Sequence, residues 1–247
     1  MANRFFLRCT LTALIVSSSV GHAAHGGGAS ETQIDTEAYA VLQKVATQLG
    51  MVRGMQRTWR SINRIYFIAE HERPGEAFSQ AVIELNYVQR AVRVIEQDQS
   101  QPKISVQRER RSWQESSPGV RVELVREAVH FSNWLYLTPH GVIRAALEAE
   151  STQPGSVTFE DQQYGSLVFE SPNGRAEIVL GVSGLPSSVN LAQVRVSAYF
   201  EDYRDWELLD VMFPVTLRLQ HADRSELYRV TEFRTNPYVV FPESTLP

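Results

Sequence analysis

YFEDYRDWELLDVMFPVTLRLQHADRSELYRVTEFRTNPYVVF, residues 199–241, reads as β-strands joined by polar turns. The segments EDYRDWELLD and HADRS separate runs in which apolar residues recur at about every second position. These apolar residues are Val194, Val196 and Ala198, then Val215, Leu217 and Leu219, and then Leu227, Tyr228, Val230 and Phe233. A period of two is typical of strands with one buried face. We therefore expect an antiparallel sheet covered on one side.

The first 24 residues are typical of a secretory signal peptide. Arg4 and Arg8 supply a positive start, an apolar run follows from Leu11 to Val20, and cleavage is expected near Ala23 or Ala24. A membrane span needs about 20 apolar residues, so this run is too short for one. We expect residues 25–35 to be a flexible lead and residues 36–247 to be one periplasmic or secreted domain.

Composition excludes several classes of function. The only cysteine, Cys9, leaves with the signal peptide, so the mature chain is expected to hold no disulfide. The formal charge is −4, and loss of Arg4 and Arg8 makes it −6. Nucleic-acid binding requires a basic surface, so we expect no nucleic-acid partner.

Two helices are expected. Residues 36–49 carry apolar side chains at steps of three and four, with Asp35 or Thr36 as N-cap and Gly50 at the end. Thr138 and Pro139 are typical of an N-cap followed by proline in the first turn, which predicts a helix to about Glu150. One or both helices would pack on the sheet.

The spacing leaves other segments open. Residues 81–97 and 120–129 fit both helical and strand periodicity, although β-branched residues favour strands in the first. WQESSPG, residues 113–119, is expected to be a turn, and STQPGS, residues 151–156, is expected to end the second helix. SPNG, residues 171–174, predicts a hairpin turn.

Several short motifs resemble known families. The motifs are Tyr199, Tyr203, Phe213-Pro214, Asn236-Pro237 and Phe241-Pro242, together with LGMVRG (49–54), WQESSPG and LTPHGVIRAAL (137–147). In this order they resemble the non-catalytic N-terminal β-domain of secreted metallo-β-lactamase-fold hydrolases and, more distantly, the half-barrel of periplasmic lipoprotein-sorting carriers. The resemblance implies an α+β fold that is mostly antiparallel β, a curled sheet or half-barrel with about two helices.

Motifs for catalysis are missing from the sequence. The H-x-H-x-D-H zinc cluster of those hydrolases, a G-x-S-x-G nucleophile elbow and a phosphate-binding loop do not occur. We therefore predict no catalytic residues, no metal and no cofactor. Of the histidines, His140 is the best functional candidate, although surface exposure explains it more simply. The acidic residues 201–210 fit a solvated hairpin loop better than a cation site.

Aromatic residues supply the best hypothesis for function. Trp134, Tyr136, Phe200, Tyr203 and Phe213 are predicted to line an apolar site in the half-barrel. The protein would then bind a lipid or another hydrophobic small molecule without catalysis. Two alternatives stay open, an accessory module for a separate metallo-hydrolase and an enzyme with an unfamiliar site.

Overall fold

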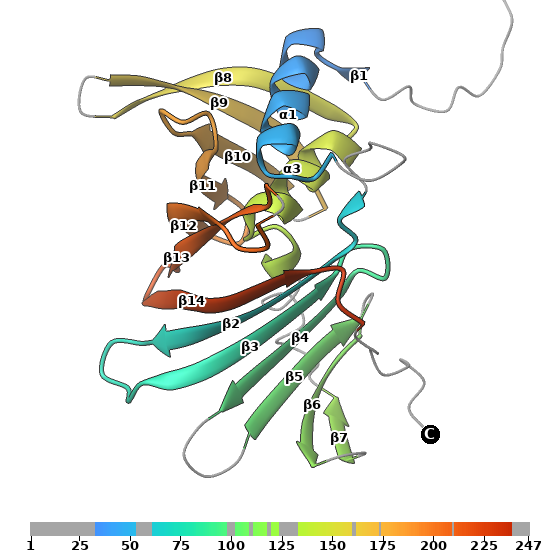
Figure 1. The fold of residues 1–247 in the computed structure, drawn as a ribbon, viewed down its shortest axis with the longest axis vertical. Coiled ribbons are helices and arrows are strands. Elements are labelled where there is room, and N and C mark those ends of the chain that lie inside the picture. Colours follow the sequence, from blue (N-terminus) through green and yellow to red (C-terminus); the bar gives the residue numbers. More distant parts are fainter. Residues whose placement is uncertain are drawn as a thin grey trace, which may run out of the picture. The chain divides into compact units, whose positions relative to one another are not determined.

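The computed structural model describes residues 33–52, 61–97, 102–108, 111–117, 120–123, 133–159, 162–172, 174–208 and 210–238. Their strands form one open sheet in the order β1-β8-β9-β10-β11-β12-β13-β14-β2-β3-β4-β5-β6-β7 (Figure 1). Among these strands, every neighbouring pair is antiparallel except β1 with β8, which is parallel. The predicted mostly antiparallel, unclosed sheet accompanied by two α-helices is thus confirmed for this part of the chain.

The bounds of the elements are as follows: β1 Gln33–Ile34, α1 Thr36–Gln48, β2 Arg64–Glu72, β3 Ser79–Asn86, β4 Ala91–Gln97, β5 Pro102–Arg108, β6 Arg111–Ser117, β7 Val120–Glu123, the 3-10 helix η2 Asn133–Leu135, α3 Pro139–Glu148, β8 Ser151–Phe159, β9 Gln162–Ser171, β10 Gly174–Leu180, β11 Pro186–Leu191, β12 Val196–Asp205, β13 Met212–Gln220 and β14 Ser225–Thr235.

The C-terminal strands join the two halves of the sheet. β14 pairs with β2 from Leu227↔Glu72 to Thr235↔Ile65, which brings together residues about 160 positions apart. Strands β8–β11 continue the sheet beyond β12, and strands β3–β7 continue it beyond β2. In Figure 1 the red β14 accordingly lies beside the cyan β2. Strands β12, β13 and β14 therefore supply the middle of the sheet.

Both predicted helices are confirmed, with the predicted caps. The Asp35 side chain accepts hydrogen bonds from the backbone N–H groups of Glu37 and Ala38, at 2.8 and 3.2 Å. Gly50 follows α1 with a φ of +71°, a conformation in which glycine is the least strained residue. In α3, the Thr138 hydroxyl accepts a hydrogen bond from Gly141 N at 3.2 Å.

Aromatic side chains from β2, β13 and β14 pack in the core under α3. The rings of Phe213 and Phe233 stack with centroids 4.2 Å apart, and Phe67 lies 5.4 Å from Phe213. His140 lies 5.8 Å from Phe213 and is fully buried, with its Nε2 3.1 Å from the carbonyl oxygen of Leu49. The expected surface position of His140 is therefore wrong, because α3 buries nearly its whole circumference.

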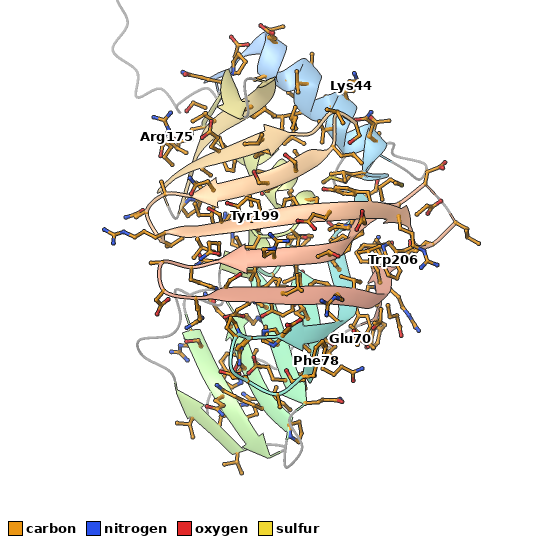
Figure 2. The ribbon with its side chains drawn as sticks, turned by 90° about the vertical axis from the view of Figure 1, so that its left-hand side faces the viewer. Lys44, Glu70, Phe78, Arg175, Tyr199 and Trp206 are labelled. Carbon is orange, nitrogen blue, oxygen red and sulfur yellow. The ribbon has the colours of Figure 1, made fainter. Side chains whose placement is uncertain are left out.

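The opposite face of the sheet meets solvent. Tyr199 on β12, Arg175 on β10 and Glu70 on β2 are exposed there, and Figure 2 shows them along the strands. Along β12, the exposed Tyr199 alternates with the buried Ala198 and Phe200. The alternation of residues in the sequence therefore corresponds to the buried and the solvent-facing sides of the sheet.

Some segments predicted as turns are strands. EDYRD lies in β12 and WQESS in β6. These two predictions were wrong because pairing with neighbouring strands overrides local composition. STQPGS ends the second helix as expected, because α3 stops at Glu148, and it also forms the start of β8. Pro154 is tolerated in β8 because β1 pairs only with Ser151 and Thr152, so the rest of that side of β8 has no described neighbour.

The structure decides between helix and strand for part of the two segments that the sequence left ambiguous. Residues 79–97 form the hairpin of β3 and β4, so the strand interpretation of residues 81–97 is confirmed. Residues 120–123 form β7, whereas residues 124–129 lie outside the described residues. Gly174 pairs with Ser171 across the predicted hairpin turn. The expected signal peptide, residues 1–24, also lies outside the described residues, and Gln33–Ile34 of the expected lead form β1.

Candidate ligand pocket

A pocket of about 450 Å³ lies where η2 faces the ends of β4, β5, β13 and β14. Sites for small molecules commonly enclose about 300–1,000 Å³. Apolar and charged residues both line the pocket, and Asn133 and His221 complete the lining. An amphipathic lining of this kind can contact an apolar group and a polar group of one ligand.

Trp134 dominates the apolar lining. The Asn133 carbonyl accepts hydrogen bonds from Tyr136 N at 2.7 Å and Leu137 N at 2.9 Å, so a tight turn fixes the position of η2. The Trp134 indole meets the Tyr228 ring edge-on, with centroids 5.2 Å apart at 85°. It is 6% exposed. Val94, Leu137 and Leu219 are the other apolar lining residues.

Glu226 on β14 is a buried carboxylate, 4% exposed, beneath the charged lining. One carboxylate oxygen accepts hydrogen bonds from Tyr228 OH at 2.7 Å and from His71 Nε2 at 3.2 Å. The other accepts from Arg224 Nε at 2.8 Å. The His71 ring also stacks on the Tyr228 ring, with centroids 4.2 Å apart and planes 8° apart. Three donors therefore hold one carboxylate.

These contacts keep Glu226 ionised. Burial by itself would raise the pKa of Glu226, but hydrogen bonds from His71 and Tyr228, and the charge of Arg73, outweigh it. The pKa of Glu226 consequently lies well below its ordinary value of 4.5. Burial and the adjacent carboxylate raise the pKa of Tyr228 well above its ordinary value of 10, so the hydroxyl stays a donor.

Arg73 ties three elements together around the pocket. Its Nη1 lies 3.3 Å from Glu76 in the same turn, its Nη2 donates to Glu96 on β4, and its Nε lies 3.8 Å from Glu226. Burial alone would lower the pKa of Arg73, but Glu96 and Glu226 raise it, so the guanidinium stays charged. One guanidinium thus contacts three carboxylates.

Two further cations lie at the mouth of the pocket. Lys103 is exposed on β5, opposite Glu96 in the strand register, and forms no ion pair with any described residue. Arg224 has a side chain 53% exposed and uses Nε for Glu226. Its two terminal nitrogens have no hydrogen-bond partner in the described part of the chain.

The five residues predicted to bind ligand do not come together. Trp134 lines this pocket, whereas Tyr136 lines a second pocket of about 360 Å³. Phe200 and Phe213 are buried in the core. Tyr203 packs beside that core and donates its hydroxyl to the carbonyl of Pro186 at 2.7 Å. A role of these residues in ligand binding remains a prediction.

The acidic residues 201–210 stabilise backbone and strand contacts. The Asp205 carboxylate accepts hydrogen bonds from the N–H groups of Asp210 and Val211, at 3.2 and 3.3 Å. Glu207 accepts from the N–H and hydroxyl of Thr235, at 2.6 and 2.8 Å. Among the described residues, no group of three or more His, Cys, Asp or Glu side chains could hold a metal ion.

Sequence reasoning missed the charged half of the pocket. Glu226 shares the inward face of β14 with Tyr228 and Val230. A glutamate at an alternate position with buried residues would have predicted a buried carboxylate. His71 and Arg73 could not be assigned, because their contacts depend on the pairing of β2 with β14.

No protein-family model matches this chain, and no match arises among curated proteins. Solved structures give weak similarities. An uncharacterized conserved protein from Thermus thermophilus is 12% identical, with 85% of this chain and 96% of that chain covered and a TM-score of 0.32. LprF from Mycobacterium bovis is 8% identical, with 85% and 97% covered and a TM-score of 0.35. A β-barrel-like protein from Brucella abortus is 6% identical, with 71% and 98% covered and a TM-score of 0.24. Similarity at this level supports no statement about function, and the resemblance to metallo-β-lactamase-fold hydrolases remains a prediction.

Proposed function

We propose that the protein binds a small hydrophobic or amphipathic molecule outside the cytoplasm, without chemical conversion of the ligand. The pocket beside Trp134 carries this proposal. Its apolar residues come from η2, the turn after η2, β4 and β13, and these elements are fixed by the sheet and by the turn at Asn133. Removal of apolar ligand surface from water would stabilise the complex by about 25 cal/mol per Å².

The site differs from the one expected in the half-barrel. Around α1 and α3 the inner face of the sheet is filled by packed side chains, such as Leu42, Phe67 and Ile143, which are at most 1% exposed. A ligand would therefore lie beside η2 rather than among the core aromatics. In the described residues, no helix is long and apolar enough to cross a membrane.

The test uses the neutral fluorescent probe N-phenyl-1-naphthylamine and a pair of tryptophan variants. Trp134→Ala should weaken probe binding by about tenfold or more, because the largest apolar surface of the pocket is lost. Trp206→Ala should leave binding within about twofold, because Trp206 lies outside the pocket and donates to the carbonyl of Phe213 at 3.0 Å. Circular dichroism would establish that both variants are folded. Equal binding by wild type and Trp134→Ala would disprove the proposed site.

A further inference from the structure

The carboxylates that line the ligand pocket have hydrogen-bond or ion-pair partners within the protein, whereas some of the cationic groups have donors without such partners. The three lining carboxylates, Glu76, Glu96 and Glu226, each have at least one partner within 3.5 Å, and Arg73 contacts all three within 4.0 Å. Lys103 and the terminal nitrogens of Arg224 have no acceptor among the described residues. Lys103 and Arg224 therefore have spare donor capacity that carries positive charge.

Burial separates the two kinds of charge. Glu226 and Glu96 lie deep, with side chains 5% and 19% exposed, whereas Arg224 and Lys103 reach solvent at the mouth. Glu76 is the one exposed carboxylate of the lining and is paired with Arg73. A ligand entering from solvent would thus meet cations before it reached the buried carboxylates.

The Trp134 indole adds a third donor. Its side chain lines the pocket, and no described residue accepts a hydrogen bond from its N–H. An acceptor supplied by a ligand in the pocket would satisfy this group.

We infer that the ligand is a single-chain amphiphile with an anionic head group, a carboxylate or a phosphate, and that Lys103 and Arg224 bind this head group. The apolar chain would lie against Trp134, Leu137 and Leu219. This inference rests on the proposed function, because it names the class of ligand for the same pocket. Carboxylate and phosphate both accept hydrogen bonds from guanidinium and ammonium groups.

The test is displacement of N-phenyl-1-naphthylamine at pH 8 by three ligands with the same 12-carbon alkyl chain: tridecanoate, dodecyl phosphate and 1-dodecanol. Partly exposed charge pairs each contribute a modest amount, about two- to fivefold in affinity. At least one anionic ligand should therefore bind roughly four- to 25-fold more tightly than 1-dodecanol. The stronger of the two anions identifies the head group. Salt at 1 M should reduce the preference, because it screens exposed charges.

Matched double variants assign the effect to the pocket. Lys103→Gln with Arg224→Gln should abolish the preference for the anion over 1-dodecanol. Lys44→Gln with Arg218→Gln removes the same residue types and the same charge from α1 and from the solvent-facing side of β13, and should leave the preference intact. Lys44 is labelled on α1 in Figure 2.

The outcomes separate the two proposals. Equal affinity for all three ligands would overturn the anionic head group and leave the proposed function in place. An equal loss in both double variants would also overturn it, because the effect would then come from net charge. Failure of the reporter and of all three ligands to bind would overturn the proposed function itself.

Discussion

The buried carboxylate of Glu226 gives the sharpest prediction of stability. Glu226→Gln preserves size but replaces one acceptor oxygen with an NH₂ group. Three donors, from His71, Tyr228 and Arg224, converge on the two carboxylate oxygens, so at least one donor would then face another donor. Removal of one partner from a buried ion pair costs about 3–5 kcal/mol. Arg224 is half exposed and adds little, so we expect a loss of about 3 kcal/mol in the free energy of unfolding.

Urea unfolding at pH 7 measures this change, with an unaltered dependence on urea concentration as the check for two-state behaviour. The control is Glu201→Gln. Glu201 pairs with Arg218 at 3.2 Å on the exposed face, and its loss should cost less than about 1 kcal/mol. If Glu226→Gln were no more destabilising than Glu201→Gln, the assignment of Glu226 as a charge held by three donors would be refuted.

The same carboxylate predicts a pH dependence. The pKa of Glu226 in the folded protein lies below its ordinary value of 4.5, so ionisation of Glu226 stabilises the fold above about pH 4.5. This contribution is lost as the pH falls from about 4.5 through the lower folded pKa. The difference in unfolding free energy between wild type and Glu226→Gln should thus shrink as the pH falls from about 4.5 towards 3. A difference that grew on acidification would contradict the direction of the shift.

Two further substitutions test the packing around the helices and the sheet. Gly141→Ala should destabilise the protein by about 3 kcal/mol, measured by urea unfolding, because the added methyl group would lie 2.1 Å from the carbonyl oxygen of Leu135; an unchanged midpoint would contradict this close approach. Tyr203→Phe should cost about 1 kcal/mol in thermal or urea unfolding, because the hydrogen bond to Pro186 is lost. Tyr199→Phe, at an exposed position on the same strand, should have no measurable effect.

The sequence supported the parts of the fold that depend on local pattern. Asp35 and Thr138 cap the two helices as their side-chain chemistry predicts. The alternation of Leu217 and Leu219 with polar residues matches their burial in β13. In these cases the residue type and its neighbours in the sequence are enough to predict the local structure, without knowledge of which distant residues it contacts.

Strand β14 shows where local pattern fails. The sequence grouped Leu227 with Tyr228, Val230 and Phe233, but a strand alternates its faces, so Leu227 and Tyr228 point in opposite directions. The structure buries Glu226 in phase with Tyr228 and leaves Leu227 half-buried. An irregularity in the pairing between Val230 and Glu232 then shifts the phase so that Phe233 also points inward.

The candidate site was harder to predict than the fold. Trp134 is the only one of the five residues predicted from their aromatic character that lines this pocket, and its role in ligand binding stays a prediction. The charged partners come from β2, β4, β5 and β14, and their convergence depends on the β14–β2 pairing. Phe200 and Phe213 were chosen for the same aromatic character, which describes a core as well as it describes a binding site.

Native mass spectrometry of the purified protein, followed by organic extraction, tests the central proposal most directly. Wild type and Trp206→Ala should carry a bound mass that organic solvent releases, and the extracted molecule should be an anionic amphiphile. Trp134→Ala, prepared in parallel and shown to be folded, should lose most of that mass. A wild-type protein with no bound mass, and with no affinity for N-phenyl-1-naphthylamine, would contradict the proposal that this pocket binds a hydrophobic or amphipathic ligand.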